Sequence, residues 1–448
     1  MQDPSRTPTF NLKVVVRETG LKPDTLRVWE KRYGIPNPER TSGGHRLYSQ
    51  RDIDILKWLM ARQKEGMRIS QAVNLWQQLE AEGKDPLESP ASAAAPIASQ
   101  TQTDLSLEGG DALTKLRQAW VAACLTFDRT QADQVLNQAF ALYAVETVCL
   151  KVLVEGLVQV GQGWYEGEIS VQQEHFASAL AVRRINALIA ASPAPTRGGR
   201  ILIACPPEEE HTVSLLLVNL FLRRQGWDVI YLGANVPIDR LQTTITTVKP
   251  DLVISAAQLL TTAASLLEMS QVIQKAQVPF AFGGAIFNRS PDLRKHIPGH
   301  FMSEKLEEVP QQVERWLTSV VSLSVNVKTK PTDPAYPPAL ANFARHQRQI
   351  ETDLAAMVKH TPINPDEVAA ANRRLSDHIT AALKLGKLES VNIELDWVKG
   401  LMSFHNVPPD QLNIYINAYC QAARRHLDPE GEPIIAWLER LANKGEAA

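Results

Sequence analysis

Apolar residues recur at helical spacing in two long parts of the chain. In residues 111–191 they return every three or four positions, as expected of helices that each bury one face. Four such helices packed together would cover those faces, so the pattern predicts a small helix bundle. Residues 341–445 show the same spacing, and the aromatic residues that we expect in their core are Trp397, Tyr415, Tyr419 and Trp437.

Residues 200–320 have a different pattern, in which short apolar runs alternate with helical segments. The runs are RILIAC, WDVIYLG, DLVISAAQ and PFAFGGAIF, and Pro, Gly or charged residues bound each of them. Strands that alternate with helices favour a parallel sheet with right-handed crossovers. We therefore predict an α/β domain between two helical segments.

The start of the chain indicates two short helices around a turn. FNLKVVVRETG supplies a helix that ends at Gly20, and Pro23 suits the first position of a second helix, which Gly34 ends. The second helix carries Arg27 and Lys31. This arrangement predicts a helix–turn–helix whose second helix presents basic side chains.

The next segment, IPNPERTSGGHRLYS, contains too much Gly and Pro for a helix. Arg40, His45 and Arg46 flank its flexible Ser-Gly-Gly. A glycine-hinged basic hairpin beside a recognition helix is a wing that can grip phosphate. Ser49 and Asp52 then have the spacing of a capping box for a further helix. The alternative is a solvated basic face without a ligand.

Breaks rich in small residues and proline divide the 448 residues into parts. The predicted parts are a DNA-binding domain at 1–84, a flexible tether at 85–110, a helix bundle at 111–192, an α/β domain at 199–322 and a C-terminal helical domain at 338–448.

Charge separates the first part from the rest. Residues 1–84, which we call the basic head, hold 15 Lys and Arg against 10 Asp and Glu, a net of +5, so the remainder carries −7. This asymmetry is expected if only the head touches a polyanion. Apolar runs are too short for a membrane span, a secretion signal is not evident, and the four cysteines lack metal-binding spacing. We expect a cytoplasmic protein that needs no membrane, disulfide framework or Cys-rich zinc site.

The loop after the first predicted strand carries Glu209 and His211. In α/β sheets, ligands bind beyond the carboxyl ends of parallel strands. An imidazole there can bind a transition metal through one nitrogen, while Glu209 holds the other and fixes the tautomer. Gly283 and Gly284 follow the fourth strand, where missing side chains would admit a large flat ligand. The alternative is an exposed loop histidine.

The bundle contains a second candidate group in GWYEGEISVQQEHFASAL. One helix ends near Trp164, and Ser170 with Gln173 can form a capping box for the next helix. Glu174 and His175 follow early in that helix, so Trp164 and this pair can face one ligand. The alternative is a buried tryptophan with a surface Glu–His pair.

The basic head closely resembles the winged helix of MerR-family transcription regulators over TLRVWEKRYGIPNPERTSGGHRLYSQRDID. The resemblance implies dimers on palindromic promoter DNA. The side chains that it places in or near the major groove are Arg27 and Tyr33, and we count Lys31 among the same DNA-binding residues. Those that it places on the DNA backbone are Arg40, His45 and Arg46. Metal-sensing members carry cysteine ligands after a dimerising helix, which are absent here, so the rest of the chain must sense something else.

The α/β domain resembles the cobalamin-binding domains, whose fold is flavodoxin-like (Rossmann-like). Their pattern is Asp/Glu-x-His-x-x-Gly, then Ser-x-Leu, then Gly-Gly. The matching positions here are Glu209, His211, Ser255, Gly283 and Gly284. The resemblance makes His211 the lower cobalt ligand. Two positions depart from the pattern: Ser214 replaces the first Gly, adding a small group near the corrin, and Ala257 replaces Leu.

The spacing of Trp, nine residues, then Glu-His resembles the bundle of CarH/LitR photoreceptor regulators. That family implies adenosylcobalamin, with Trp164 over the adenosyl group and Glu174 and His175 at its polar edge. We count Val171 among the same cofactor-binding residues. In the family, the cofactor builds a dark tetramer from head-to-tail dimers, and light dissolves it. We therefore expect a light-responsive repressor, not an enzyme, that competes with RNA polymerase at the promoter.

Some family members carry His directly after this Trp, where the chain has Tyr165. A neutral phenol is a poor cobalt ligand near neutral pH. We expect water, or another residue such as His175, at the upper cobalt position after photolysis.

Two alternatives stay open. The protein is a MerR-type repressor that responds to a partner or another ligand without cobalamin, which the departures at Ser214 and Ala257 favour. Alternatively, the protein is a subunit of a cobalamin-dependent enzyme, although proteins of that class do not need a winged helix for DNA binding. The C-terminal domain has no recognised motif, and we expect an accessory oligomerisation role for it.

Overall fold

The computed structural model describes residues 7–40, 46–64, 69–81, 108–319, 323–404, 407–408 and 410–446. The chain divides into two units, Met1–Thr103 and Asp104–Ala448, and each is described by itself. Of the predicted DNA contacts, His45 lies outside the described residues, and so does the side chain of Arg40. Most of the predicted tether lies outside them as well.

In the first unit, α1 (Leu12–Thr19) and α2 (Pro23–Tyr33) form the predicted helix–turn–helix. Gly20 and Gly34 follow them in the left-handed conformation, with φ of 72° and 69°, where a side chain would add strain. Pro23 begins α2, as its fixed φ favours.

A three-stranded antiparallel sheet lies beside these helices in the order β1-β3-β2. Its strands are β1 (Phe10–Asn11), β2 (Glu39–Arg40) and β3 (Arg46–Tyr48). The unit continues with α3 (Gln50–Lys64) and α4 (Ile69–Ala81). The Asp52 N–H donates to Ser49 Oγ (3.1 Å) and the Ser49 N–H to Asp52 Oδ2 (2.8 Å), which is the predicted capping box. Val15, Leu26, Trp29, Tyr48 and Trp76 lie in one core.

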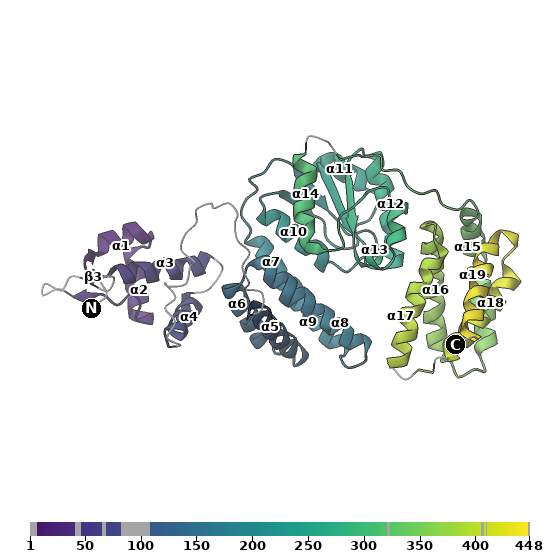
Figure 1. Cartoon of the computed structure of the whole chain (residues 1–448), viewed down its shortest axis with the longest axis horizontal. Coiled ribbons are helices and arrows are strands. Elements are labelled where there is room, and N and C mark those ends of the chain that lie inside the picture. The colour runs from purple at the N-terminus through teal and green to yellow at the C-terminus, as the bar shows by residue number, and fades with distance from the viewer. Residues whose placement is uncertain are drawn as a thin grey trace. The chain divides into compact units, whose positions relative to one another are not determined.

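The second unit begins with a helix bundle, as the pattern predicted (Figure 1). Its elements are α5 (Glu108–Leu125), α6 (Arg129–Leu142), α7 (Val145–Val148), the π-helical segment η2 (Cys149–Val154), α8 (Glu155–Tyr165) and α9 (Val171–Ala190). Helical backbone runs from α7 through η2 into α8. Gly156 lets this long element approach α5, because a Cβ there would lie 2.8 Å from the Trp120 ring. Ser170 and Gln173 form the predicted capping box of α9.

The α/β domain contains a parallel sheet in the order β5-β4-β6-β7-β8, the strand order of flavodoxin-like folds. The strands are β4 (Arg200–Ile203), β5 (Asp228–Tyr231), β6 (Leu252–Ala256), β7 (Phe280–Gly283) and β8 (His300–Phe301). The helices are α10 (Val213–Arg224), α11 (Leu241–Val248), α12 (Leu260–Lys275), α13 (Ala285–Arg289), η3 (Pro291–His296), η4 (Leu306–Glu308) and α14 (Val309–Thr318). Figure 1 shows α10 and α14 on one face of the sheet and α12 on the other. The two-residue β8 was not predicted, because it is too short for an apolar pattern.

Helix α10 joins the α/β domain to the bundle. Leu215, Val218 and Leu222 pack into the core on one face of the sheet. Leu217 and Phe221, from the other side of the same helix, belong to the core of the bundle. Because α10 is buried on both sides, it needs apolar residues all round, which explains the run VSLLLVNLFL.

The C-terminal helices pack against α12, which covers the opposite face of the sheet, and their core is continuous with that of the α/β domain. They are α15 (Tyr336–Val358), α16 (Pro365–Lys384), η5 (Leu388–Ser390), α17 (Val391–Phe404), α18 (Asp410–His426), η6 (Pro429–Gly431) and α19 (Glu432–Glu446). Tyr415, Tyr419 and Trp437 are buried as predicted, but Trp397 is 36% exposed. The prediction for Trp397 was wrong because helical spacing does not separate a core position from one that faces a neighbouring domain. Within the described ranges, the helices lack the combination of length and hydrophobicity that crossing a bilayer requires.

Candidate functional site

Glu209 and His211 lie in the loop between β4 and α10, at the carboxyl end of the sheet. The loop is anchored by Asn235, which follows β5. The Asn235 side chain accepts from the Glu208 N–H at 2.8 Å, and its N–H donates to the Glu209 carbonyl at 3.0 Å. Glu208 and Asn235 both have positive φ, 67° and 49°. The two loops therefore hold each other in a defined turn directly before His211.

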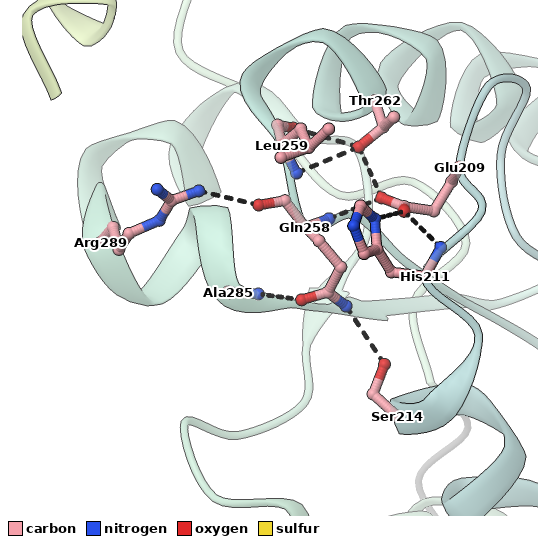
Figure 2. Close-up of polar contacts among 8 residues, drawn as sticks. All are labelled: Glu209, His211, Ser214, Gln258, Leu259, Thr262, Ala285 and Arg289. Carbon is pink, nitrogen blue, oxygen red and sulfur yellow. Dashed lines mark hydrogen bonds and ion pairs between the residues drawn. The ribbon is translucent and has the colours of Figure 1, made fainter. Parts of the chain in front are cut away.

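The Glu209 carboxylate is fully buried, and hydrogen bonds satisfy both of its oxygens. Oε1 accepts from the ring Nδ1 of His211 at 2.6 Å and from the His211 N–H at 2.9 Å. Oε2 accepts from the Gln258 N–H at 2.7 Å and from the Thr262 hydroxyl at 2.6 Å (Figure 2). Burial by itself raises the pKa of Glu209, but these hydrogen bonds together hold the pKa below its ordinary value. The group is therefore a buried carboxylate anion.

The His211 side chain is 60% exposed, although its Nδ1 is held by Glu209. Since an ionised carboxylate only accepts, Nδ1 carries the proton and Nε2 keeps its lone pair in the neutral ring. The hydrogen bond to Glu209 raises the pKa of His211, and the Glu174 carboxylate of the bundle adds to this effect. Glu174 thus lies near enough to act on His211 from the other domain. The arrangement can present Nε2 to a metal with its orientation fixed.

Gln258 connects the segments around this pair, and it was not among the predicted site residues. Its side chain donates to Ser214 Oγ at 3.1 Å and accepts from the Ala285 N–H at 3.0 Å. Its carbonyl accepts from Arg289 at 2.8 Å (Figure 2). Its place directly beyond β6, where ligand-binding loops of such sheets lie, is the signal that could have found it. Ser214, the first departure from the family pattern, is thus engaged with Gln258.

Ser255 and the two glycines have different surroundings. The Ser255 hydroxyl is buried and has no hydrogen-bond partner among the described residues, so it is free to meet a polar group of a ligand. Gly284 has φ of 116°, and a Cβ there would overlap the Ala257 carbonyl. A Cβ on Gly283 would lie 3.2 Å from Met302. Protein packing therefore explains Gly284 by itself, and access for a flat ligand stays a prediction for both glycines.

The predicted bundle residues lie around the junction of α8 and α9. Glu174 holds the exposed His175 ring through Nδ1 at 2.6 Å, and the Ser178 hydroxyl donates to Glu174 at 2.7 Å. Val171 is the first residue of α9 and is 42% exposed. The Trp164 ring stacks on Trp397 of α17, with centroids 6.2 Å apart and planes 29° apart. The role of these residues at a cofactor stays a prediction.

In the first unit, α2 presents its basic side chains as predicted. Arg27 and Lys31 are exposed, whereas Tyr33 is partly buried against the core. Arg46 of β3 donates to Glu30 of α2 at 2.8 Å, and this contact raises the pKa of Arg46. The wing is thus tied to the second helix, and the DNA contact of Arg46 stays a prediction.

Three family models match the chain. The MerR HTH family regulatory protein matches residues 10–79. One B12 binding domain matches residues 116–189, and another matches residues 199–307. The matches cover the helix–turn–helix, the bundle and the α/β domain. The C-terminal helices lie beyond them.

Known proteins resemble large parts of the chain. The HTH-type transcriptional repressor CarH of Myxococcus xanthus is 33% identical over 245 residues, which are 55% of this chain and 77% of the relative. The repressor CarA of the same organism is 31% identical over 249 residues, 55% of this chain and 75% of the relative. The trimethylamine corrinoid protein of Methanosarcina barkeri is 25% identical over 173 residues, 36% of this chain and 79% of that protein.

These similarities confirm the predicted resemblance to MerR and CarH-type regulators, and the two relatives from Myxococcus xanthus are repressors rather than enzymes. By its domains and by its identity to CarH over more than two thirds of that relative, the chain belongs to the CarH-type family of MerR-like, cobalamin-linked transcriptional repressors.

Proposed function

We propose that the protein is a light-responsive repressor, which binds promoter DNA in the dark as an adenosylcobalamin-bound oligomer and releases it after illumination. The observation that carries the proposal is the pair of Glu209 and His211. A buried and fully hydrogen-bonded carboxylate holds Nδ1, while the ring stays exposed at the carboxyl end of the sheet. This donor arrangement fits a cobalt corrinoid that would be held through the His211 ring.

His211 would hold cobalt through Nε2, and Glu209 would keep the ring in the required tautomer. The buried Ser255 hydroxyl, which lacks a protein partner among the described residues, would take a hydrogen bond with the corrinoid. Gly283, Gly284 and Ser214 would line its lower side. When bound, adenosylcobalamin supplies a cobalt–carbon bond that visible light breaks.

Trp164, Val171, Glu174 and His175 would cover the upper side from the bundle. The position of Glu174 supports this, because its carboxylate comes from the bundle and still contributes to raising the pKa of His211 in the α/β domain. An upper group in this space would contact both domains and so stabilise one arrangement of them. Loss of that group would shift the population towards another arrangement.

The basic head would then contact DNA through Arg27 and Tyr33 in or near the major groove, with Lys31 acting on phosphate charge and the wing on the backbone. Joining several heads in one oligomer raises their affinity for neighbouring half-sites without any new contact. RNA polymerase would be excluded from a promoter covered in this way.

Gel filtration of the full chain tests the proposal. Adenosylcobalamin is added in the dark, a duplex from the region upstream of the chain's own gene is included, and samples are run before and after green light. We expect a larger assembly and bound duplex only in the dark, and loss of both after light. His211→Ala should abolish uptake of the red chromophore, while the control His300→Ala, at the far edge of the sheet, should retain it. The same assembly in darkness and light would overturn the light response.

A further inference from the structure

Helix α17 of the C-terminal domain contacts the end of α8 that carries the candidate upper-side residue Trp164. The Trp397 ring lies 6.2 Å from the Trp164 ring and 5.4 Å from the Tyr165 ring, centroid to centroid. The Tyr165 hydroxyl donates to the Trp397 carbonyl at 3.1 Å. Phe404, at the end of α17, meets the Tyr165 ring edge-on at 5.5 Å. Tyr165 is therefore held against α17 by two aromatic contacts and a hydrogen bond.

A glycine on α17 makes this contact possible. A Cβ on Gly400 would overlap the Tyr165 hydroxyl and lie 3.0 Å from its Cζ. Gly400 lies three residues after Trp397, so that the two positions share one face of the helix. The space left by the missing side chain of Gly400 and the ring of Trp397 together form the surface of α17 on which Tyr165 packs. The residue that replaces the family's histidine thus has a structural use in this chain.

The same helix also reaches the α/β half of the site. Glu394, one turn before Trp397, is buried and lies 3.6 Å from the Arg289 guanidinium. Arg289 donates to the Gln258 carbonyl, and the Gln258 N–H donates to Glu209 (Figure 2). Helix α17 is therefore in contact with both domains that would enclose the corrinoid.

We propose that α17 forms a third wall of the corrinoid site, in which Trp397 is a positioning residue that holds the Trp164 indole on the upper side. The inference rests on the proposed function, since it concerns the upper ligand of the same cofactor. If the Trp164 indole covers the upper side as proposed, a bulky upper ligand would touch it and a small one would not. A fixed Trp164 ring therefore favours adenosylcobalamin over a cobalamin with a small upper ligand.

Equilibrium binding in the dark tests the role of Trp397. The full chain is titrated separately with adenosylcobalamin and with aquocobalamin, and binding is followed by the absorption spectrum. The loss of one aromatic pair should weaken adenosylcobalamin about three- to tenfold in Trp397→Ala and leave aquocobalamin nearly unchanged. Trp397→Phe should restore most of the preference. The matched control is Asp396→Ala, which alters the exposed neighbour on the same helix.

Hydrogen exchange of the full chain tests the docking without any cofactor. Gly400→Ala should raise exchange in α17 and at the end of α8, because the added methyl displaces the Tyr165 hydroxyl. In a Tyr165→Phe background the displaced hydroxyl is absent, so the same Gly400→Ala change should have a smaller effect. Equal effects in both backgrounds, or no change in α17, would overturn the docking.

The outcomes separate the two proposals. If the wild type takes up neither cobalamin, the proposed function fails, and the role of Trp397 fails with it. If both cobalamins bind and Trp397→Ala weakens them equally or not at all, only the role of Trp397 is overturned.

Discussion

The carboxylate of Glu209 accepts a hydrogen bond from the His211 ring at 2.6 Å, although the first side chain is fully buried and the second is largely exposed. A charge is expensive to bury unless hydrogen bonds replace its water. Here two backbone N–H groups, a hydroxyl and the imidazole do so. The loop between β4 and α10 is thus organised around the Glu209 carboxylate, and His211 is the exposed member among its hydrogen-bond partners.

Removal of that anion should weaken corrinoid binding. Glu209→Gln keeps the size of the side chain but removes the charge that fixes the His211 tautomer. We expect the dissociation constant for adenosylcobalamin to rise about 10- to 100-fold, the usual cost of losing the partner of a metal-bound histidine. Titration followed by the absorption spectrum measures it. Glu210→Gln removes an equal charge from the exposed neighbour and should have little effect. Equal losses in the two variants would contradict the role of Glu209.

Thr262 supports the buried carboxylate from the first turn of α12, and its loss should destabilise the second unit. Thr262→Val keeps the shape but removes the hydroxyl that donates to Glu209 at 2.6 Å. A lost hydrogen bond to a buried charge costs about 1.5–3 kcal/mol of unfolding free energy. Urea denaturation of the ligand-free chain measures it. The neighbouring Thr261→Val serves as the control, and a similar loss there would argue against the specific contact.

Lys31 is exposed on α2 and should act through DNA phosphate charge. Lys31→Ala should weaken binding to all duplexes alike and lower the slope of log affinity against log salt by about one. Fluorescence anisotropy at several salt concentrations measures the slope. Lys275→Ala, at the end of α12 in the other unit, should leave it unchanged. A changed sequence preference with an unchanged slope would place Lys31 on a base edge instead.

Asp292 of η3 links the α/β domain to the C-terminal helices through Lys387, at 2.5 Å. Hydrogen bonds from Lys387 and Lys295 lower the pKa of Asp292 from 3.8 to about 2. Because folding lowers this pKa, the carboxylate stabilises the fold above its unfolded pKa, and this contribution is lost as pH falls from about 4 towards 2.

Asp292→Asn should therefore have a lower urea midpoint than the wild type at pH 6, and the difference should shrink as the pH approaches 2. Chemical denaturation at a series of pH values measures it. Asp239→Asn, an exposed carboxylate in another loop, is the control. A difference that does not vary with pH would show that Asp292 contributes through shape rather than charge.

Local chemistry made much of this protein predictable. Gly20, Pro23 and Gly34 set the ends of the helix–turn–helix, and Ser170 with Gln173 set the start of α9, because each acts on residues within one helical turn. Glu209 and His211 were predicted as a hydrogen-bonded pair for the same reason, being two residues apart.

Contacts between distant segments were not predictable in this way. Gln258 joins Ser214 of α10, Ala285 of α13 and Glu209 of the loop after β4. Tyr165 and Trp397 are 232 positions apart. Nothing in the spacing of either segment indicates the other, so such contacts become visible only once the chain is folded.

The position of α10 between two cores has a consequence for how this protein can be altered. A helix with solvent on one side can tolerate polar changes there, but α10 has no such side along Leu215–Leu222. Cutting the chain between Ala190 and Arg200 to isolate either domain would expose the apolar side of α10 that packs against the bundle. Each separated piece should aggregate because apolar surface is exposed. The two domains therefore have to be expressed and engineered together.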